Sequence, residues 1–205
     1  MRRVFMMVLV LMVSASFGGV GRLLEAGGLS GPGGVDQERK PPVPPKRVLI
    51  VYFSHSGNTR ELANQIHRNV GGDLFEIVTV QPYPREYKEV LAVAKRERDS
   101  QFRPKLSKRV KNLDDYDLVF LGYPNWYGTL PMALMSFLEE NDLSGKTIAP
   151  FCTHGGGRWG ESVETIKRLC PRSTLLEGLA VEGGLVKSSQ GDVADWLRKL
   201  GRLRE

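Results

Sequence analysis

The sequence has few residues of the kinds that build metal sites and disulfide scaffolds. Only two cysteines, Cys152 and Cys170, and three histidines occur among 205 residues. The cysteines are too few and too far apart in sequence for a disulfide framework or a zinc site, and the histidines show no metal-ligand spacing. The sequence therefore predicts no metal site and two separate thiols.

Other absences exclude whole classes of enzyme. No Gly-x-Gly-x-x-Gly follows the first strand-like segment and no Gly-Lys-Ser/Thr closes its loop, which argues against dinucleotide and nucleoside triphosphate binding. No Gly-x-Ser-x-Gly occurs anywhere, which argues against a serine hydrolase. Basic residues outnumber acidic ones by 29 to 23. This charge permits an anionic partner, but by itself it does not indicate nucleic acid, and we expect none.

Residues 1–17 have the pattern of an export signal or a membrane anchor. Arg2-Arg3 precedes an apolar run, Val4 to Val13, and small residues follow. This run is shorter than the roughly 20 residues that span a bilayer, which favours an export signal. The arginine pair also resembles the core of a twin-arginine signal. We expect an exported protein that is periplasmic or anchored on the outer face of the membrane. The pattern does not indicate whether the N-terminal segment is cleaved.

Residues 18–45 are predicted to form a disordered linker. They contain eight glycines and five prolines among 28 residues. Such a composition cannot bury enough apolar area to order the chain. The folded domain is therefore expected to comprise residues 46–205, which keep a net charge of about +4 because they hold 24 basic and 20 acidic residues.

Within that domain, buried strands alternate with amphipathic helices. The apolar run Arg47 to Phe53 is rich in β-branched residues, as expected of a strand that is covered on both faces of a parallel sheet. The pattern predicts strands at 47–53, 73–80, 118–123, 147–153 and 174–181, and helices ending near 70 and spanning about 86–98, 131–139, 161–169 and 192–200. Alternation of this kind predicts an α/β fold with a doubly wound parallel sheet. A ligand then lies beyond the carboxyl ends of the strands.

The loop after the first strand is suited to holding a phosphate. Hydroxyl, amide and glycine residues that begin a helix offer N–H and O–H donors without a lysine or a metal. Alternatively, Asn58 or Thr59 serves only as a helix cap. The candidate phosphate ligands are Ser54, His55, Ser56, Gly57, Asn58 and Thr59.

Two further loops at strand ends have compositions that suit a flat ligand. Large aromatic rings after the third strand either contact a planar ring or cover the edge of the sheet. Glycines after the fourth strand let backbone amides approach a ligand closely. The candidate residues are Pro124, Asn125, Trp126, Tyr127 and Gly128 in the former loop, and Thr153, His154, Gly155, Gly156 and Gly157 in the latter.

Together these three loops resemble the flavodoxin-like family, whose members bind FMN. The resemblance is carried by VLIVYFSHSGNTRELANQI, GYPNWYG and FLEENDLSGKTIAPFCTHGGG, and it covers nearly all of residues 46–205. It implies a three-layer fold with a five-stranded parallel sheet in the order 2-1-3-4-5, with FMN phosphate in the first loop and flavin between the other two. Two departures are the basic charge, where electron-carrying flavodoxins are usually acidic, and the export signal.

The resemblance leaves three functions open. The first is an electron-transfer flavoprotein that passes electrons to a redox partner protein and needs no catalytic residue of its own. The second is an enzyme that reduces quinones or similar acceptors with NAD(P)H, and the third is a flavin-free binding module. Residues 95–111 contain eight basic and two acidic residues and could dock an acidic partner, or they form only a solvated face. Arg158 is the charge expected to lie nearest the flavin.

Overall fold

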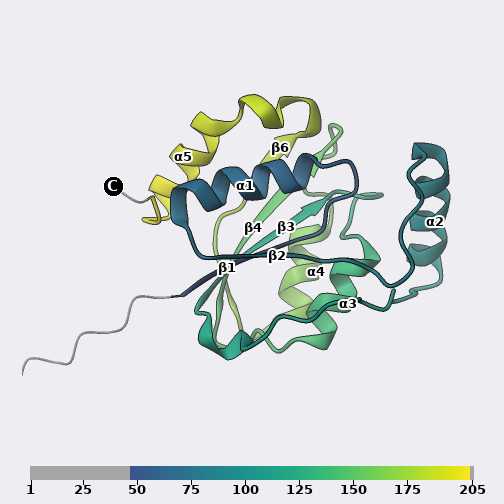
Figure 1. The fold of residues 1–205 in the computed structure, drawn as a ribbon, viewed down its shortest axis with the longest axis horizontal. Helices are drawn as coiled ribbons and strands as arrows, with labels where there is room; N and C mark the ends of the chain where they lie inside the picture. Colours follow the sequence, from purple (N-terminus) through teal and green to yellow (C-terminus); the bar gives the residue numbers. More distant parts are fainter. Residues whose placement is uncertain (1–46, 204–205) are drawn as a thin grey trace, which may run out of the picture. The chain divides into compact units, whose positions relative to one another are not determined.

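The computed structural model describes residues 47–203 and shows a parallel sheet between two layers of helices (Figure 1). The strand order β2-β1-β3-β4-β5 confirms the predicted order and the flavodoxin-like architecture. The strands are β1 (Val48–Tyr52), β2 (Asp73–Glu76), β3 (Leu118–Pro124), β4 (Thr147–His154), β5 (Thr174–Leu175) and β6 (Leu179–Glu182). The predicted export signal and linker, residues 1–45, lie outside the described residues.

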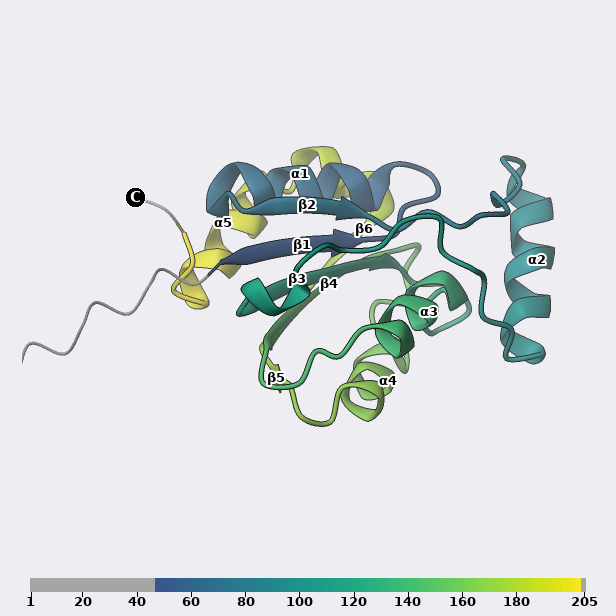
Figure 2. The same cartoon turned by 60° about the horizontal axis from the view of Figure 1, so that its bottom comes forward.

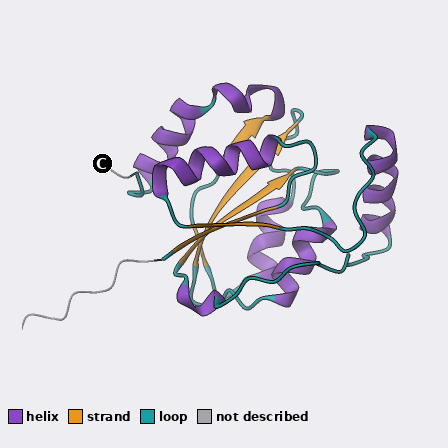
Figure 3. Ribbon diagram, in the orientation of Figure 1, coloured by secondary structure: helices purple, strands orange, loops and turns teal. Residues whose placement is uncertain are grey.

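Helices cover both faces of the sheet. The helices are α1 (Asn58–Val70), α2 (Tyr87–Asp99), α3 (Met132–Glu140), α4 (Ser162–Leu169) and α5 (Gln190–Lys199), with short 3-10 helices η1 (Leu113–Asp115) and η2 (Gly183–Ser188). In Figures 2 and 3, α1 and α5 lie on one face and α3 and α4 on the other. No helix among residues 47–203 is long and apolar enough to cross a membrane.

The apolar strands are explained by this double covering. Successive side chains of a strand point to opposite faces. In β1, Leu49 and Val51 enter the core under α3 and α4, whereas Ile50 and Tyr52 enter the core under α1 and α5. Each strand residue therefore needs an apolar side chain, which is why the sequence shows continuous runs and not an alternating pattern.

The fifth predicted strand is interrupted in the structure. Its first part, β5, pairs with β4 at Thr147 and Ile148, and its second part, β6, pairs with β4 from Phe151 onward. The N–H of Leu176 donates to the oxygen of Ile148 (2.8 Å), so the next residue of β4 facing this neighbour is Pro150. Proline has no N–H to donate, and the ladder therefore breaks opposite it.

Helix α2 lies apart from the other helices, beyond the carboxyl ends of the strands (Figures 1 and 2). The spacing of apolar residues in the sequence predicts one apolar face of this helix, formed by Tyr87, Val90, Leu91 and Ala94. Val90 and Ala94 are buried accordingly, but Tyr87 is 71% exposed. Glu97 is buried instead, and its carboxylate accepts a hydrogen bond from the Tyr83 hydroxyl at 2.6 Å. Burial raises the pKa of Glu97 above its ordinary value. One buried polar pair thus helps to hold α2 against the body.

The two cysteines are separate thiols in the structure, as predicted. Cys152 lies in β4 and Cys170 follows α4, and both are buried. Burial raises the pKa of Cys152 to about 12 and that of Cys170 to about 11. Neither side chain forms the reactive thiolate at neutral pH.

Candidate functional site

The largest candidate site is a cavity of about 640 Å³ at the carboxyl ends of the strands. Loops following β1, β3, β4 and β6 form its walls, and the first residues of α2 add a further side. This is the position at which parallel α/β sheets bind ligands. The volume lies within the range of cofactor sites. We call this space the main cavity.

The structure brings most of the predicted site residues to this cavity. The twelve that line it are His55, Ser56, Asn58, Pro124, Asn125, Trp126, Tyr127, Gly128, Thr153, His154, Gly155 and Gly157. The other four, Ser54, Gly57, Thr59 and Gly156, are not on its wall. Three loops that are distant in sequence therefore meet around one space, because β1, β3 and β4 are adjacent and parallel.

The β1–α1 loop turns sharply before α1 begins. Gly57 has φ +93°, in the left-handed region that glycine adopts without steric cost. The hydroxyl of Ser54 accepts the N–H of Arg60 (3.2 Å), which caps an early turn of α1. Thr59 is buried, and its hydroxyl shares a hydrogen bond of 2.8 Å with the hydroxyl of Thr153. Ser56 and Asn58, together with His55, are the polar residues of this loop that line the main cavity.

The aromatic loop after β3 ends in a tight turn. Trp126 and Thr129 exchange backbone hydrogen bonds of 3.1 and 3.0 Å, and both residues between them have positive φ, +52° at Tyr127 and +77° at Gly128. These angles are those of a type I′ turn. A left-handed conformation is unfavourable for tyrosine. Contacts with α2 hold Tyr127 there, because its hydroxyl donates to the Leu91 oxygen (3.0 Å) and Arg98 covers its ring.

Trp126 is packed into an aromatic cluster. Its ring centroid lies 5.3 Å from that of Phe53 and 5.2 Å from that of Tyr83, both in edge-to-face geometry. His55 lies 6.0 Å away. Because Trp126 also lines the main cavity, the cluster fixes one wall of the site. Tyr127 is the more exposed ring, with 43% of its surface accessible.

The glycine-rich loop after β4 is organised by His154. The N–H of Gly156 donates to Nδ1 of His154 (3.0 Å), so the neutral ring carries its proton on Nε2. Partial burial, and next the nearby Arg158 cation, lower the pKa of His154. The ring is therefore neutral at pH 7 and keeps this hydrogen bond. Arg158 lines a neighbouring cavity of about 480 Å³ and does not line the main one, so its expected place nearest the flavin stays a prediction.

The sequence reasoning missed a fourth wall. Glu182, Gly183 and Gly184 follow β6 and line the main cavity. A Cβ at Gly183 would lie 2.7 Å from Nδ2 of Asn58, so a larger residue there would require the Asn58 side chain to move. The sequence did contain an indication of this wall, because Gly183 and Gly184 closely follow the predicted strand 174–181.

Comparisons with known proteins agree with this architecture. The family model for flavodoxin matches residues 47–200. A candidate flavoprotein from Bacteroides eggerthii DSM 20697 superimposes with a TM-score of 0.64 at 31% identity, covering 76% of this chain and 98% of that one. A flavoprotein in complex with FMN from Lactobacillus acidophilus NCFM has a TM-score of 0.58 at 21% identity, covering 70% and 97%.

Among curated proteins, an NAD(P)H dehydrogenase (quinone) from Sinorhizobium fredii (strain NBRC 101917 / NGR234) is 28% identical over 154 residues. The match covers 72% of this chain and 74% of that protein. Its sequence similarity extends over most of the domain that forms the main cavity. From the family match over residues 47–200 and the 31% identity to the Bacteroides protein, the chain belongs to the flavodoxin family.

Proposed function

We propose that this chain is an electron-transfer flavoprotein that holds FMN in the main cavity and passes electrons to a redox partner. The observation that carries the proposal is the convergence of a hydroxyl and amide loop, an aromatic loop and two glycine-rich loops on one cavity of about 640 Å³. Membership of the flavodoxin family supports FMN as the cofactor. When bound, FMN supplies the redox chemistry.

The residues on the cavity wall fit the two ends of FMN. At the start of α1, Ser56 and Asn58 offer polar side chains beside a helix N-terminus, where a phosphate is favoured. Trp126 and Tyr127 offer flat apolar surface for the ring system, and the loop from His154 to Gly157 offers backbone groups along another side. The same chain thus provides donors for an anion and rings for a planar heterocycle within one space.

The residues around the main cavity hold its loops in place and need not take part in the redox reaction. Thr59 and Thr153 join the loops after β1 and β4 through their hydroxyl groups, and the Asn125 amide donates to the Arg158 oxygen at 2.6 Å. These bonds fix the loop spacing independently of a ligand. Preorganised walls reduce the entropy lost when a cofactor binds.

The phosphate assignment predicts that replacing both Ser56 and Asn58 by alanine weakens FMN binding by about a hundredfold or more. Hydrogen bonds to a charged group are worth about 1.5–3 kcal/mol each, and tenfold corresponds to about 1.4 kcal/mol. Riboflavin, which lacks the phosphate, should bind the variant and the parent equally. Isothermal titration calorimetry with both ligands measures this. Ser54→Ala is the matched control, because Ser54 lies in the same loop but not on this cavity.

Equal losses for FMN and riboflavin would place the phosphate elsewhere. A parent chain that binds neither ligand would leave the flavin-free binding module as the function of this fold.

For the redox partner, we propose a protein with an acidic surface that docks on residues 95–111. Lys95 and Arg98 are paired with Asp99, and Arg103 with Glu139. The remaining basic residues of the segment, Arg96, Lys105, Lys108, Arg109 and Lys111, have no ion pair within residues 47–203. Unpaired cations favour association with an acidic surface and speed it at low salt.

We also propose that the protein is exported, because residues 1–17 have the pattern of an export signal.

The second candidate function is reduction of quinones by NAD(P)H, and it is favoured by the similarity to the Sinorhizobium protein. Mixing the FMN-loaded protein with NADPH or NADH under anaerobic conditions distinguishes the two functions. For an electron carrier we expect the flavin absorbance at about 450 nm to persist for minutes after NADPH or NADH is added. Loss of this absorbance within seconds, followed by its return on adding a quinone, would instead establish the reductase.

A further inference from the structure

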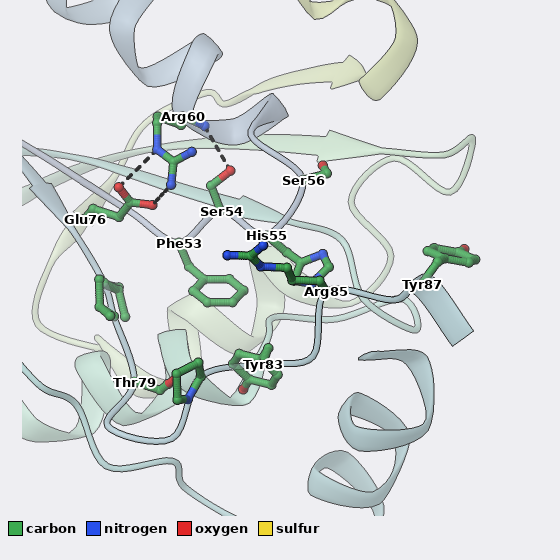
Figure 4. A pocket seen from close by; sticks show the side chains of 13 residues that line it. Phe53, Ser54, His55, Ser56, Arg60, Glu76, Thr79, Tyr83, Arg85 and Tyr87 are labelled. Carbon is green, nitrogen blue, oxygen red and sulfur yellow. Dashed lines mark hydrogen bonds and ion pairs between the residues drawn. The ribbon is translucent and has the colours of Figure 1, made fainter. Parts of the chain in front are cut away.

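A second cavity, of about 460 Å³, adjoins the main cavity at the β1–α1 loop (Figure 4). It is bounded by the end of β2 and by residues 77–87, which connect β2 to α2. Phe53, Ile77 and Tyr83 provide apolar surface in its wall. Three of the predicted phosphate ligands, Ser54, His55 and Ser56, also line this cavity, but the sequence indicated no second ligand site. We call it the side cavity.

The walls of the side cavity are held in place by the backbone. Thr79 forms an antiparallel bridge with Leu106, and the N–H of Val80 donates to the Lys105 oxygen at 2.8 Å. Nε2 of His55 lies 2.6 Å from the oxygen of Pro84. Because a carbonyl only accepts hydrogen bonds, Nε2 carries the proton and ties the 77–87 connection to the β1–α1 loop. The cavity is therefore built by tertiary contacts at both of its ends.

The charges of the side cavity are unbalanced. Glu76 is its one carboxylate, and the Arg60 guanidinium binds it through both Nε (3.1 Å) and a terminal nitrogen. The Tyr52 hydroxyl is a further partner of Glu76, at 3.4 Å. Arg85 also lines the cavity, and within residues 47–203 no carboxylate pairs with it. A neutral ion pair and one unpaired guanidinium leave the cavity with a net positive charge.

We propose that the side cavity binds a small planar aromatic anion, a compound of one or two rings with a carboxylate or sulfonate. The partly exposed ring of Tyr83 and the exposed Val78 supply the apolar surface for its rings, and the buried Phe53 supports Tyr83 in edge-to-face geometry at a centroid separation of 5.4 Å. The unpaired Arg85 receives the anionic group, for which a guanidinium is suited by its planar set of donors. A neutral aromatic compound leaves Arg85 unpaired, and a compact inorganic anion leaves the apolar wall unfilled.

This site is distinct from the proposed FMN site but adjacent to it. His55, Ser56 and Tyr87 line both cavities, and Trp126 of the main cavity packs against Phe53 and Tyr83 of the side cavity. The two cavities therefore adjoin each other at the β1–α1 loop and the start of α2. Simultaneous binding is expected, with the aromatic anion held close to the cofactor. The inference goes beyond the proposed function, since it concerns a second ligand.

Calorimetric titration of 2-naphthalenesulfonate into the full-length, FMN-saturated protein tests the proposal. We expect one molecule to bind, and Arg85→Gln to weaken it about threefold to tenfold, because a charge-assisted hydrogen bond at an exposed arginine is lost. The neutral probe 2-naphthalenemethanol should bind more weakly and equally to both proteins. The control Arg168→Gln removes an exposed arginine that lines neither the side cavity nor the main cavity, and it should leave binding of both probes unchanged.

Two further measurements keep the outcome decisive. Val78 lines the side cavity and is 39% exposed, so Val78→Trp should fill the space and abolish binding of both naphthalene probes while FMN still binds. FMN affinity measured separately shows whether the main cavity is intact, so failure of one site does not imply failure of the other. The proposal is overturned if 2-naphthalenesulfonate displaces FMN, if Arg85→Gln and Arg168→Gln act alike, or if no binding occurs at millimolar probe.

Discussion

Replacing Gly160 by alanine is expected to destabilise the protein by about 2–4 kcal/mol and to weaken FMN binding. Gly160 has φ +52°, where an L-residue is strained by about 1–2 kcal/mol. The added Cβ would lie 2.1 Å from the Gly128 oxygen, and a clash with buried or fixed atoms costs about 1–3 kcal/mol more. Urea denaturation measures the change. Gly128 belongs to the turn that carries Tyr127, so relief of the clash should move that turn and disturb the main cavity.

Gly145→Ala is the matched control for this substitution. Gly145 also has positive φ, +75°, but an added Cβ would meet nothing within 4 Å. We expect a loss of only about 1–2 kcal/mol from backbone strain, with FMN affinity unchanged. Equal destabilisation by the two substitutions would show that the approach of Gly160 to Gly128 contributes nothing beyond the strain of its backbone.

Truncation of Trp126 to alanine is expected to lower both stability and FMN affinity. Removing a fully buried tryptophan costs about 3–5 kcal/mol, and Trp126 is only partly buried, so we expect a loss of about 2–3 kcal/mol. Loss of an aromatic contact with the cofactor should weaken FMN binding about tenfold. Trp126→Phe retains a ring against Phe53 and Tyr83 and should restore most of the stability. Urea denaturation and calorimetry measure the two effects.

Tyr127→Asn separates the two aromatic residues. Tyr127 is exposed, and asparagine tolerates its left-handed backbone conformation, so we expect stability to change by less than about 1 kcal/mol. FMN affinity should fall, because a ring at the mouth of the main cavity is lost. If neither Trp126→Ala nor Tyr127→Asn alters FMN affinity, the flavin does not lie against this loop.

The sequence alone determined the class of fold and the loops in which the candidate site lies. Continuous apolar runs at 47–53, 118–123 and 147–153 indicate strands covered on both faces, since any polar residue there would be buried. Parallel strands bring their carboxyl ends to one edge, so the loops that follow them must converge. The order of the strands came from resemblance to the flavodoxin-like family and not from periodicity, because a pattern within one strand carries no information about its neighbour.

Boundaries and exceptions depended on contacts between distant residues. The predicted strand 174–181 divides because Pro150, in a neighbouring strand, has no N–H to donate. The helix face of α2 was predicted correctly for Val90 and Ala94 and wrongly for Tyr87, which is exposed at the start of α2 beside the two cavities. Glu97 of α2 is buried although it is charged. A pattern of apolar residues could not indicate this, because Glu97 is held by a hydrogen bond from Tyr83, which lies in the connection before the helix.

Only the tertiary structure decided which polar groups face the candidate ligand. Ser56 and Thr59 belong to the same short loop and are equally suited by chemistry to hold a phosphate, yet Ser56 lines the main cavity and Thr59 turns away to bond Thr153. The side cavity arises in the same way, from a connection that folds back over β1 and leaves Arg85 unpaired. Local sequence determines whether a residue is apolar, polar or conformationally free. The direction in which the Thr59 side chain points depends on Thr153, which is 94 residues away in sequence. Sequence patterns do not show such a partner, because a hydrogen bond depends on distance in space and not along the chain.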